Sequence, residues 1–494
     1  MQFLRSQGAS NSEVIWLFLL FAIFLAINLL TASLSPTVWM DEVTLADPAI
    51  NLRLFGRLTS SAWYVQSDQE FWSGSPPLYS LLLSAWLWIA PISPTGVRSL
   101  NFILMVLSCL ALWSALRRSQ IIQSPAARLL FIVLVMCGAC TAFSYRSGRP
   151  DTLGVLLVSI LALLVVCKPS GLRLALVFVV GSLLPWTGLQ VVLYAAILAA
   201  IAVIITRTLP LVSVVLAAGT AAGGIALGLL YVMAGTLSAF VASVRYHTVL
   251  TSGQGRDYAS LLTVGREILV TDRSTLLLLP ILAIVILMAS RRTQDHRRLL
   301  WFFVLAIVLV PPILDSLGKF PFYYFWMVFI PLSFLAAFVI DHEWTRRKYV
   351  AIAAFGLVCG AMLVGLPARI AIALVEAQAR DYSKASAYVV SVLKADDKAF
   401  IDYPAYYPAK LHTQNVYVPI YLQIISNAER RNVTVAILSG DLKDPHAFLT
   451  KEFGGDWEEA GPGYAPAIDR GVLGVLTLAT PYRFVVFRRK PAAK

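Results

Sequence analysis

Charged residues are scarce in this sequence of 494 residues: Asp, Glu, Lys and Arg make up 14% of it, whereas hydrophobic residues make up 58%. A soluble globular protein contains about 25% charged residues, so a water-soluble fold is excluded for most of the chain. The mean hydropathy of +0.75 agrees with this exclusion. Apolar runs of about 20 residues, the length that crosses a bilayer, recur from residue 14 to residue 366. We therefore predict an α-helical protein that crosses the membrane many times.

Cysteine is scarce too, and its five residues all lie within apolar runs. Buried cysteine behaves as a small hydrophobic residue, so a disulfide framework is excluded, and a metal or redox role for the pair Cys137 and Cys140 is the weaker alternative. Acidic residues are fewer than basic ones, which gives a net charge of +13. The basic residues form short clusters between the apolar runs, as they do on the cytoplasmic side of membrane proteins. We therefore expect a lipid bilayer as partner and no nucleic acid.

Eleven apolar runs are predicted to be transmembrane helices. They are 14–34, 97–116, 127–144, 152–167, 172–186, 187–206, 208–233, 274–290, 299–314, 321–340 and 349–366. The first run is too long for the core of a signal peptide, so we expect an uncleaved anchor.

A further run, residues 78–90, is short and bracketed by prolines, and runs of this length are often interfacial or re-entrant. If the N-terminus is cytoplasmic and this run does not cross, nearly every basic cluster between the spans faces the cytoplasm, as the charge rule requires. A crossing at 78–90 would move all later clusters to the outer side. We therefore predict a helix that lies at the outer surface.

This topology divides the chain into a transmembrane domain, residues 1–366, which includes the outer loop 35–96, and an extracytoplasmic tail, residues 367–494. Polar residues reach ordinary soluble frequency in the tail, and helical and extended patterns alternate there. The expected strands are 398–403, 433–438 and 482–488, and the expected helices are 382–394 and 420–431. We predict a small α/β domain outside a multi-pass protein of the inner (plasma) membrane.

Two adjacent carboxylates, Asp41 and Glu42, open the first outer loop directly after the first span. Carboxylates at a membrane surface are costly to keep without a partner. Asp41 as the N-cap of a helix is one reading. The functional reading is a general base, since a carboxylate within hydrogen-bond reach of a hydroxyl takes its proton during attack.

A second polar group follows the third span, where Arg146, Arg149 and Asp151 stand at the outer ends of two spans. Asp151 at a helix N-terminus is favourable in itself. The two guanidinium groups are well matched to phosphate. We leave both readings open.

Lys319 is a third candidate, because it is the only basic residue of a short outer loop and is followed closely by Tyr323 and other aromatics. Interfacial aromatics are ordinary, whereas a lone lysine on the outer side indicates a phosphate contact. His247, in the long outer loop 234–273, is a weaker candidate for a functional residue.

Three short motifs occur in a fixed order: Asp41-Glu42, then Pro76-Pro77-Leu78-Tyr79, then Arg149-Pro150-Asp151. Their order and spacing resemble the protein-mannosyltransferase-like superfamily of C-type (GT-C) glycosyltransferases, which includes the lipid A aminoarabinose transferase. The resemblance covers residues 14–167 by motifs and the later spans by layout, and does not extend to the tail.

The resemblance implies an inverting transfer of a sugar from a polyprenyl-phosphate donor to an acceptor hydroxyl on the extracytoplasmic side. It implies Asp41 as the base, Glu42 beside it, and Asp151 as a second acidic site residue. Where the aminoarabinose enzyme has Glu-Lys-Pro, residues 74–77 are Gly-Ser-Pro-Pro, so an acid and a lysine are missing. The replacements and the candidate substrate-binding residues are then as follows: Lys319 or the pair Arg146 and Arg149 for the donor phosphate, Glu70 for the missing acid, and Glu70, Tyr79, His247 and Tyr323 for substrate.

Several alternatives stay open at this point. The resemblance implies no certain cofactor; carboxylate oxygens suit magnesium or manganese, but adjacent residues seldom direct their side chains at one ion. The acceptor is a lipid, a glycan or a protein. A flippase or transporter would place ionisable groups near the middle of the membrane, whereas here they lie at span ends. A glycan polymerase or ligase differs only in the size of the group that is moved.

Overall fold

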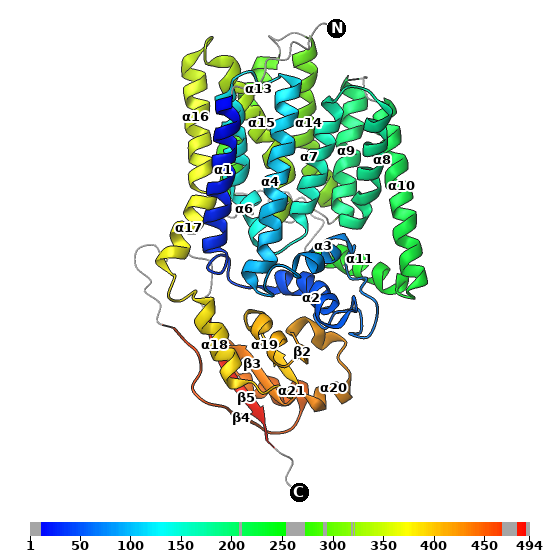
Figure 1. Ribbon diagram of the computed structural model, residues 1–494, viewed down its shortest axis with the longest axis vertical. Coiled ribbons are helices and arrows are strands. Elements are labelled where there is room, and N and C mark those ends of the chain that lie inside the picture. Colours follow the sequence, from blue (N-terminus) through cyan, green and yellow to red (C-terminus); the bar gives the residue numbers. More distant parts are fainter. Residues whose placement is uncertain are drawn as a thin grey trace.

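The computed structural model describes residues 11–206, 210–252, 272–289, 294–317, 320, 322–466 and 482–490. A bundle of long helices forms one part of the molecule, and a small domain with a sheet forms the opposite end (Figure 1). Short helices lie in a layer between the two. The protein is therefore helical and polytopic, with a mixed α/β domain in its C-terminal region.

The bundle consists of helices that coincide with the predicted apolar runs and of α17, which extends past the last predicted run into the predicted tail. They are α1 (Asn11–Thr31), α4 (Pro94–Ser119), α5 (Pro125–Cys137), α6 (Ala139–Arg146), α7 (Asp151–Val166), α8 (Gly171–Thr187), α9 (Leu189–Thr206), α10 (Pro210–Met233), α13 (Arg273–Ala289), α14 (Gln294–Ser316), α15 (Trp326–Glu343), α16 (Lys348–Leu363) and α17 (Leu366–Val375). Within a helix the backbone N–H and C=O groups form hydrogen bonds with one another, and lipid offers them no other partner. Three of them begin at a serine whose side chain accepts a backbone N–H of the first turn, namely Ser93, Ser124 and Ser170.

Six helices of the described chain are long and apolar enough to cross a membrane, and the pair α5 and α6, bent by 58°, raises the number to seven if it is one span. Helices α7, α8, α9 and α13 are apolar but shorter. Every predicted span therefore falls on a helix, while the number of eleven crossings stays a prediction.

The layer between bundle and domain contains α2 (Met40–Phe55), α3 (Leu78–Trp86) and α11 (Leu237–Ser252). Helix α3 has nine residues and lies beside α2 rather than among the long helices, as the charge pattern predicts for 78–90. Helix α11 lies within the predicted connection 234–273 and belongs to this layer rather than to the bundle.

The C-terminal domain contains one sheet of five strands in the order β2-β1-β3-β5-β4. Strand β1 is parallel to β2 and β3, and β5 is antiparallel to β3 and β4. The strands are β1 (Ala399–Ile401), β2 (Val416–Tyr417), β3 (Val435–Ser439), β4 (Trp457–Glu459) and β5 (Phe484–Arg489), and the helices are α18 (Tyr382–Val392), α19 (Tyr406–His412), α20 (Asn427–Asn432) and α21 (Pro445–Phe453). The three predicted strands are confirmed, and β2 and β4 are additional.

The basic clusters lie at the end of the bundle opposite the C-terminal domain. The α4–α5 connection, the start of α14 and the α15–α16 connection all lie at that end (Figure 1). The segments 41–42 and 146–151, which contain the predicted catalytic and phosphate-binding residues, lie at the other end of the bundle, next to the C-terminal domain.

Candidate active site

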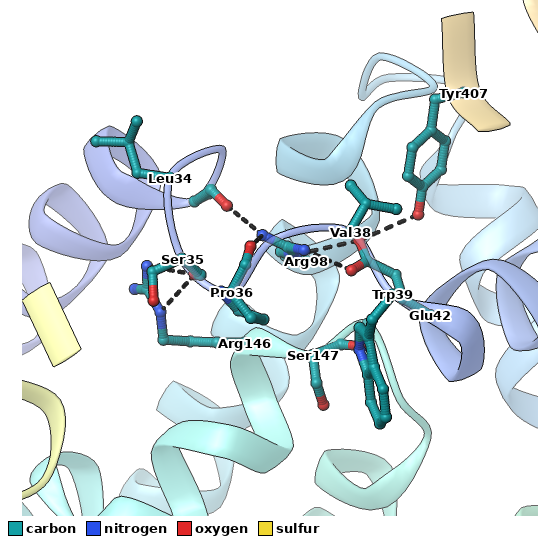
Figure 2. A network of polar contacts seen from close by, with 12 residues as sticks. Leu34, Ser35, Pro36, Val38, Trp39, Glu42, Arg98, Arg146, Ser147 and Tyr407 are labelled. Atoms are coloured by element: carbon teal, nitrogen blue, oxygen red, sulfur yellow. Dashed lines mark hydrogen bonds and ion pairs between the residues drawn. The ribbon is translucent and has the colours of Figure 1, made fainter. Parts of the chain in front are cut away.

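The segment that links α1 to α2 fixes the position of the site, and two buried arginines hold it. Arg98, from α4, donates to the carbonyl oxygens of Ala32 and Pro36, the latter at 2.8 Å. Arg146, from α6, donates to the carbonyl oxygen of Ser35 at 2.8 Å. Figure 2 shows both guanidinium groups directed at this segment. Their donors satisfy carbonyls that no helix satisfies, so α2 begins at a defined place.

Glu42 is enclosed by this arrangement. Its carboxylate is paired with the Arg98 guanidinium, and both side chains have 0% exposure. The Tyr407 hydroxyl of the C-terminal domain donates to the same carboxylate at 3.1 Å (Figure 2). Glu42 therefore joins α2, α4 and the domain. This position suits a residue that positions the loop; its predicted direct part in catalysis stays a prediction.

Asp41, in contrast, is partly open. Its side chain is 21% exposed, whereas that of Asp151 is 2% exposed. The guanidinium of Arg149 lies between the two carboxylates: it pairs with Asp41 and donates from Nε to Asp151 at 2.7 Å. Neither acid caps its helix through its side chain. Asp41 is thus a carboxylate held by one cation at the surface of the site.

The turn that carries Arg149 is held from three sides. Gly148 has φ +68°, and a Cβ there would lie 2.6 Å from Cγ of Glu42, so only glycine suits this turn. The Tyr79 hydroxyl donates to the carbonyl oxygen of Gly148 at 3.1 Å, and Asn101 donates to that of Arg149 at 2.9 Å. Tyr79 therefore supports the turn in this structure, and its predicted contact with substrate stays a prediction.

Aromatic residues lie near the Asp41–Arg149 pair. The Arg149 guanidinium lies 3.7 Å from the centre of the Tyr323 ring. Burial and the nearby Asp41 charge both raise the pKa of Tyr64, and they raise that of Tyr403 as well. The rings therefore stay neutral phenols at physiological pH. Flat, partly apolar faces beside a carboxylate suit a sugar ring, which has apolar C–H faces and a polar rim.

The arrangement does not favour a metal ion. Within the described part of the chain, no three side chains of His, Cys, Asp or Glu gather in a group that would hold one. Arg149 occupies the space between the carboxylates of Asp41 and Asp151, and Glu42 is turned to Arg98. The residues present therefore fit a guanidinium rather than a divalent cation.

The remaining predicted residues take different places. Arg146 is 1% exposed, and its donors go to the backbone and to side chains of residues 28–35, so it is engaged in the fold. Glu70 is exposed, and it forms no ion pair with another described residue. Lys319 lies outside the described residues, as does the side chain of His247. The predicted phosphate and substrate contacts of these four stay predictions.

The packing around Gly74 leaves no room for a glutamate at the start of the segment 74–77, where the aminoarabinose enzyme has Glu-Lys-Pro. A Cβ at this position would lie 2.4 Å from the Trp72 ring and 2.6 Å from Nε1 of Trp63. A glutamate cannot occupy this backbone position without displacing two buried tryptophans.

Sequence reasoning missed Arg98 and Tyr407. Arg98 lies inside the predicted span 97–116, and a charge within an apolar run is itself a signal of a buried partner. Tyr407 lies 365 residues from Glu42 in sequence, and no local pattern predicts such a contact.

No protein-family model matches the sequence, and no curated protein sequence matches it either. Solved structures do match. ArnT from Cupriavidus metallidurans bound to undecaprenyl phosphate aligns with a TM-score of 0.58 at 12% identity, covering 98% of this chain and 99% of that one. The Archaeoglobus fulgidus oligosaccharyltransferase in complex with zinc and sulfate aligns with a TM-score of 0.51 at 11% identity, covering 85% and 67%. The chain therefore has the membrane fold of these GT-C glycosyltransferases.

Proposed function

We propose that this protein is a membrane glycosyltransferase that moves a sugar from a polyprenyl-phosphate donor to an acceptor hydroxyl, with inversion, on the extracytoplasmic side. The observation that carries the proposal is Asp41: a partly open carboxylate at the ends of the spans, paired with Arg149, whose guanidinium lies against the Tyr323 ring. The fold supports it, since the protein aligns over nearly its whole length with a structure of ArnT bound to undecaprenyl phosphate. The motifs around Asp41 and Asp151, which resemble those of GT-C glycosyltransferases, also support the proposal.

The reaction needs one base and a fixed geometry. The Asp41 carboxylate accepts the proton of the acceptor hydroxyl as its oxygen forms a bond to the anomeric carbon. The bond from that carbon to the phosphate oxygen breaks at the opposite face, and polyprenyl phosphate leaves with the electron pair. Phosphate leaves as an anion, so the site needs cations at the leaving group rather than a protonating acid.

Arg149 and Asp151 position the base in this proposal. Two of the five N–H donors of a guanidinium are used on the carboxylates of Asp41 and Asp151. The remaining N–H groups belong to the same planar guanidinium, whose position these two pairs fix. Arg149 therefore remains a candidate, together with Lys319, for binding the phosphate of the sugar donor. A transporter or flippase is less well supported, because the carboxylates of Asp41 and Asp151 lie at the ends of spans and are paired with Arg149, instead of lining a path through the bundle.

The variant Asp41→Asn tests the proposal, because it keeps the shape of the side chain and removes its basicity. Transfer should fall by roughly 10²–10⁴-fold, measured with purified protein, a set of labelled polyprenyl-phosphate monosaccharides and a membrane lipid extract as acceptor. The exposed Asp396 of the C-terminal domain gives the matched control Asp396→Asn, which should retain full transfer. Near-native turnover of Asp41→Asn would rule Asp41 out as the base.

A further inference from the structure

Two adjoining cavities lie at the far end of α2 from Asp41. The first has a volume of about 610 Å³ and the second of about 240 Å³, and both are lined by Arg57, Thr59 and Gln69. Neither is used by the proposed chemistry at Asp41. Their shared residues make them two chambers of one site, which we call the α2 site.

The larger chamber is mostly apolar. Its further lining residues are Leu52, Gly56, Leu58, Phe71, Pro77, Leu81, Trp186 and Leu230. Trp186 and Leu230 lie near the ends of α8 and α10 that face the C-terminal domain, and both helices are apolar. Its walls are fixed, since the Tyr231 hydroxyl donates to the carbonyl oxygen of Ser75 at 3.1 Å and the Trp186 indole to that of Gly223 at 3.0 Å.

The smaller chamber is polar and lies between α2 and the C-terminal domain. Its further lining residues are Asn51, Phe55, Ser61, Asp68, Lys410, Gln414, Asn415, Val416 and Tyr417. Ser61 donates to the carbonyl oxygen of Val416 at 2.8 Å and so closes the contact between loop and domain. Amides, a carboxylate, hydroxyls and a tyrosine ring together are the groups that hydrogen-bond sugar hydroxyls and stack on sugar faces.

We propose that the α2 site binds a lipid-anchored saccharide, with the chain in the apolar chamber and the sugar in the polar one. This proposal rests on the proposed transferase function, because it makes this molecule the acceptor. A free sugar leaves the apolar chamber without a ligand, and a peptide offers no chain for it.

The distance to Asp41 sets the size of the saccharide. Ten residues of helix separate Asn51 from Asp41, which is about 15 Å at a rise of 1.5 Å per residue. The sugar in the polar chamber is therefore not the one that is modified. The acceptor carries several sugar units, and an outer one reaches Asp41.

Binding of a model glycolipid tests the α2 site without relying on catalysis. The full-length Asp41→Asn protein is held in amphipol and titrated with radiolabelled dodecyl maltoside. Maltose, which lacks the chain, and dodecylphosphocholine, which lacks the sugar, are the comparison ligands. Dodecyl maltoside should bind at least about tenfold more tightly than either, a difference of about 1.4 kcal/mol.

Leu81 and Leu82 offer a matched pair of variants. They are neighbours on α3 with similar exposure, 40% and 38%, but only Leu81 lines the apolar chamber. Leu81→Trp narrows the chamber and should weaken binding by about tenfold, or about 1.4 kcal/mol, whereas Leu82→Trp should leave it unchanged. On the polar side, Tyr417→Ala should weaken binding of dodecyl maltoside but not of dodecylphosphocholine.

Two outcomes overturn the proposal: equal binding of dodecylphosphocholine and dodecyl maltoside, or unchanged binding by Leu81→Trp in a protein that stays folded by size-exclusion chromatography. Selective binding in a protein that transfers no sugar from any donor would overturn the transferase function and leave the α2 site standing.

Discussion

Two adjacent carboxylates in one helix differ because of what surrounds them. Asp41 keeps 21% of its side chain exposed, and Glu42 keeps none. A buried ion pair contributes little net stability when it is complete, but removal of one partner leaves an uncompensated charge. The same chemical group therefore serves as a candidate base at one position and as a structural clamp at the next.

This difference predicts opposite effects of two similar changes. Glu42→Gln leaves the Arg98 guanidinium buried without its counter-charge, and should lower the free energy of unfolding by about 3 kcal/mol. Asp41→Asn should change thermal stability little while it abolishes transfer. Thermal unfolding in amphipol measures both. A Glu42→Gln protein as stable as the parent would show that the pair does not hold α2, and the double variant Glu42→Leu with Arg98→Met should regain part of the loss.

The C-terminal domain is attached to α2 through helix α19. Asp47 of α2 accepts hydrogen bonds from the Tyr406 hydroxyl and from Ser60, the latter at 2.7 Å, and forms an ion pair with Lys410 at 3.4 Å. Asp47 and Lys410 have side-chain exposures of 0% and 3%. One buried carboxylate thus joins three segments that are far apart in sequence.

Lys410→Met should loosen this junction, because Asp47 then keeps its charge without a cation. A loss of about 3 kcal/mol is expected for a buried pair broken from one side. Hydrogen exchange should rise first in α19 and in residues 58–62, before it rises in the bundle. Lys451→Met, at an exposed position of α21, is the control. If protection of α19 is unchanged in Lys410→Met, the ion pair has no part in docking.

Apolar runs and charge clusters predict the helices of the bundle and the place of α3, because lipid allows few alternatives. In the tail, the sequence predicts the longer strands but not β2 and β4, which have two and three residues. Such short strands show no alternating pattern. The grouping of Asp41 with Asp151 was implied by the family resemblance of the motifs. The contacts of Glu42 and Asp47 with the C-terminal domain depend on docking, which only the three-dimensional structure shows.

At the scale of the whole molecule, the basic clusters and the candidate active site lie at opposite ends of the bundle. Basic residues gather in the connections at one end of the bundle, and the paired carboxylates and the sheet domain lie at the other. Positive charge close to the span ends remains on the cytoplasmic side during insertion. From the charge distribution we predict that the candidate site faces away from the cytoplasm.

Labelling with a membrane-impermeant thiol reagent in intact cells tests this orientation. Cysteines introduced at Gln294 and Arg346, exposed positions at the basic end, should react only after the membrane is permeabilised. Cysteines at Lys394 and Lys451, exposed on the C-terminal domain, should react at once. The parent protein gives the background, since Cys109 and Cys140 are buried and the other three cysteines lie in apolar segments. The reversed pattern would place Asp41 in the cytoplasm, and a donor sugar presented at the outer surface would then be out of its reach. Labelling of all four positions in intact cells would mean that the chain does not span the membrane with one orientation.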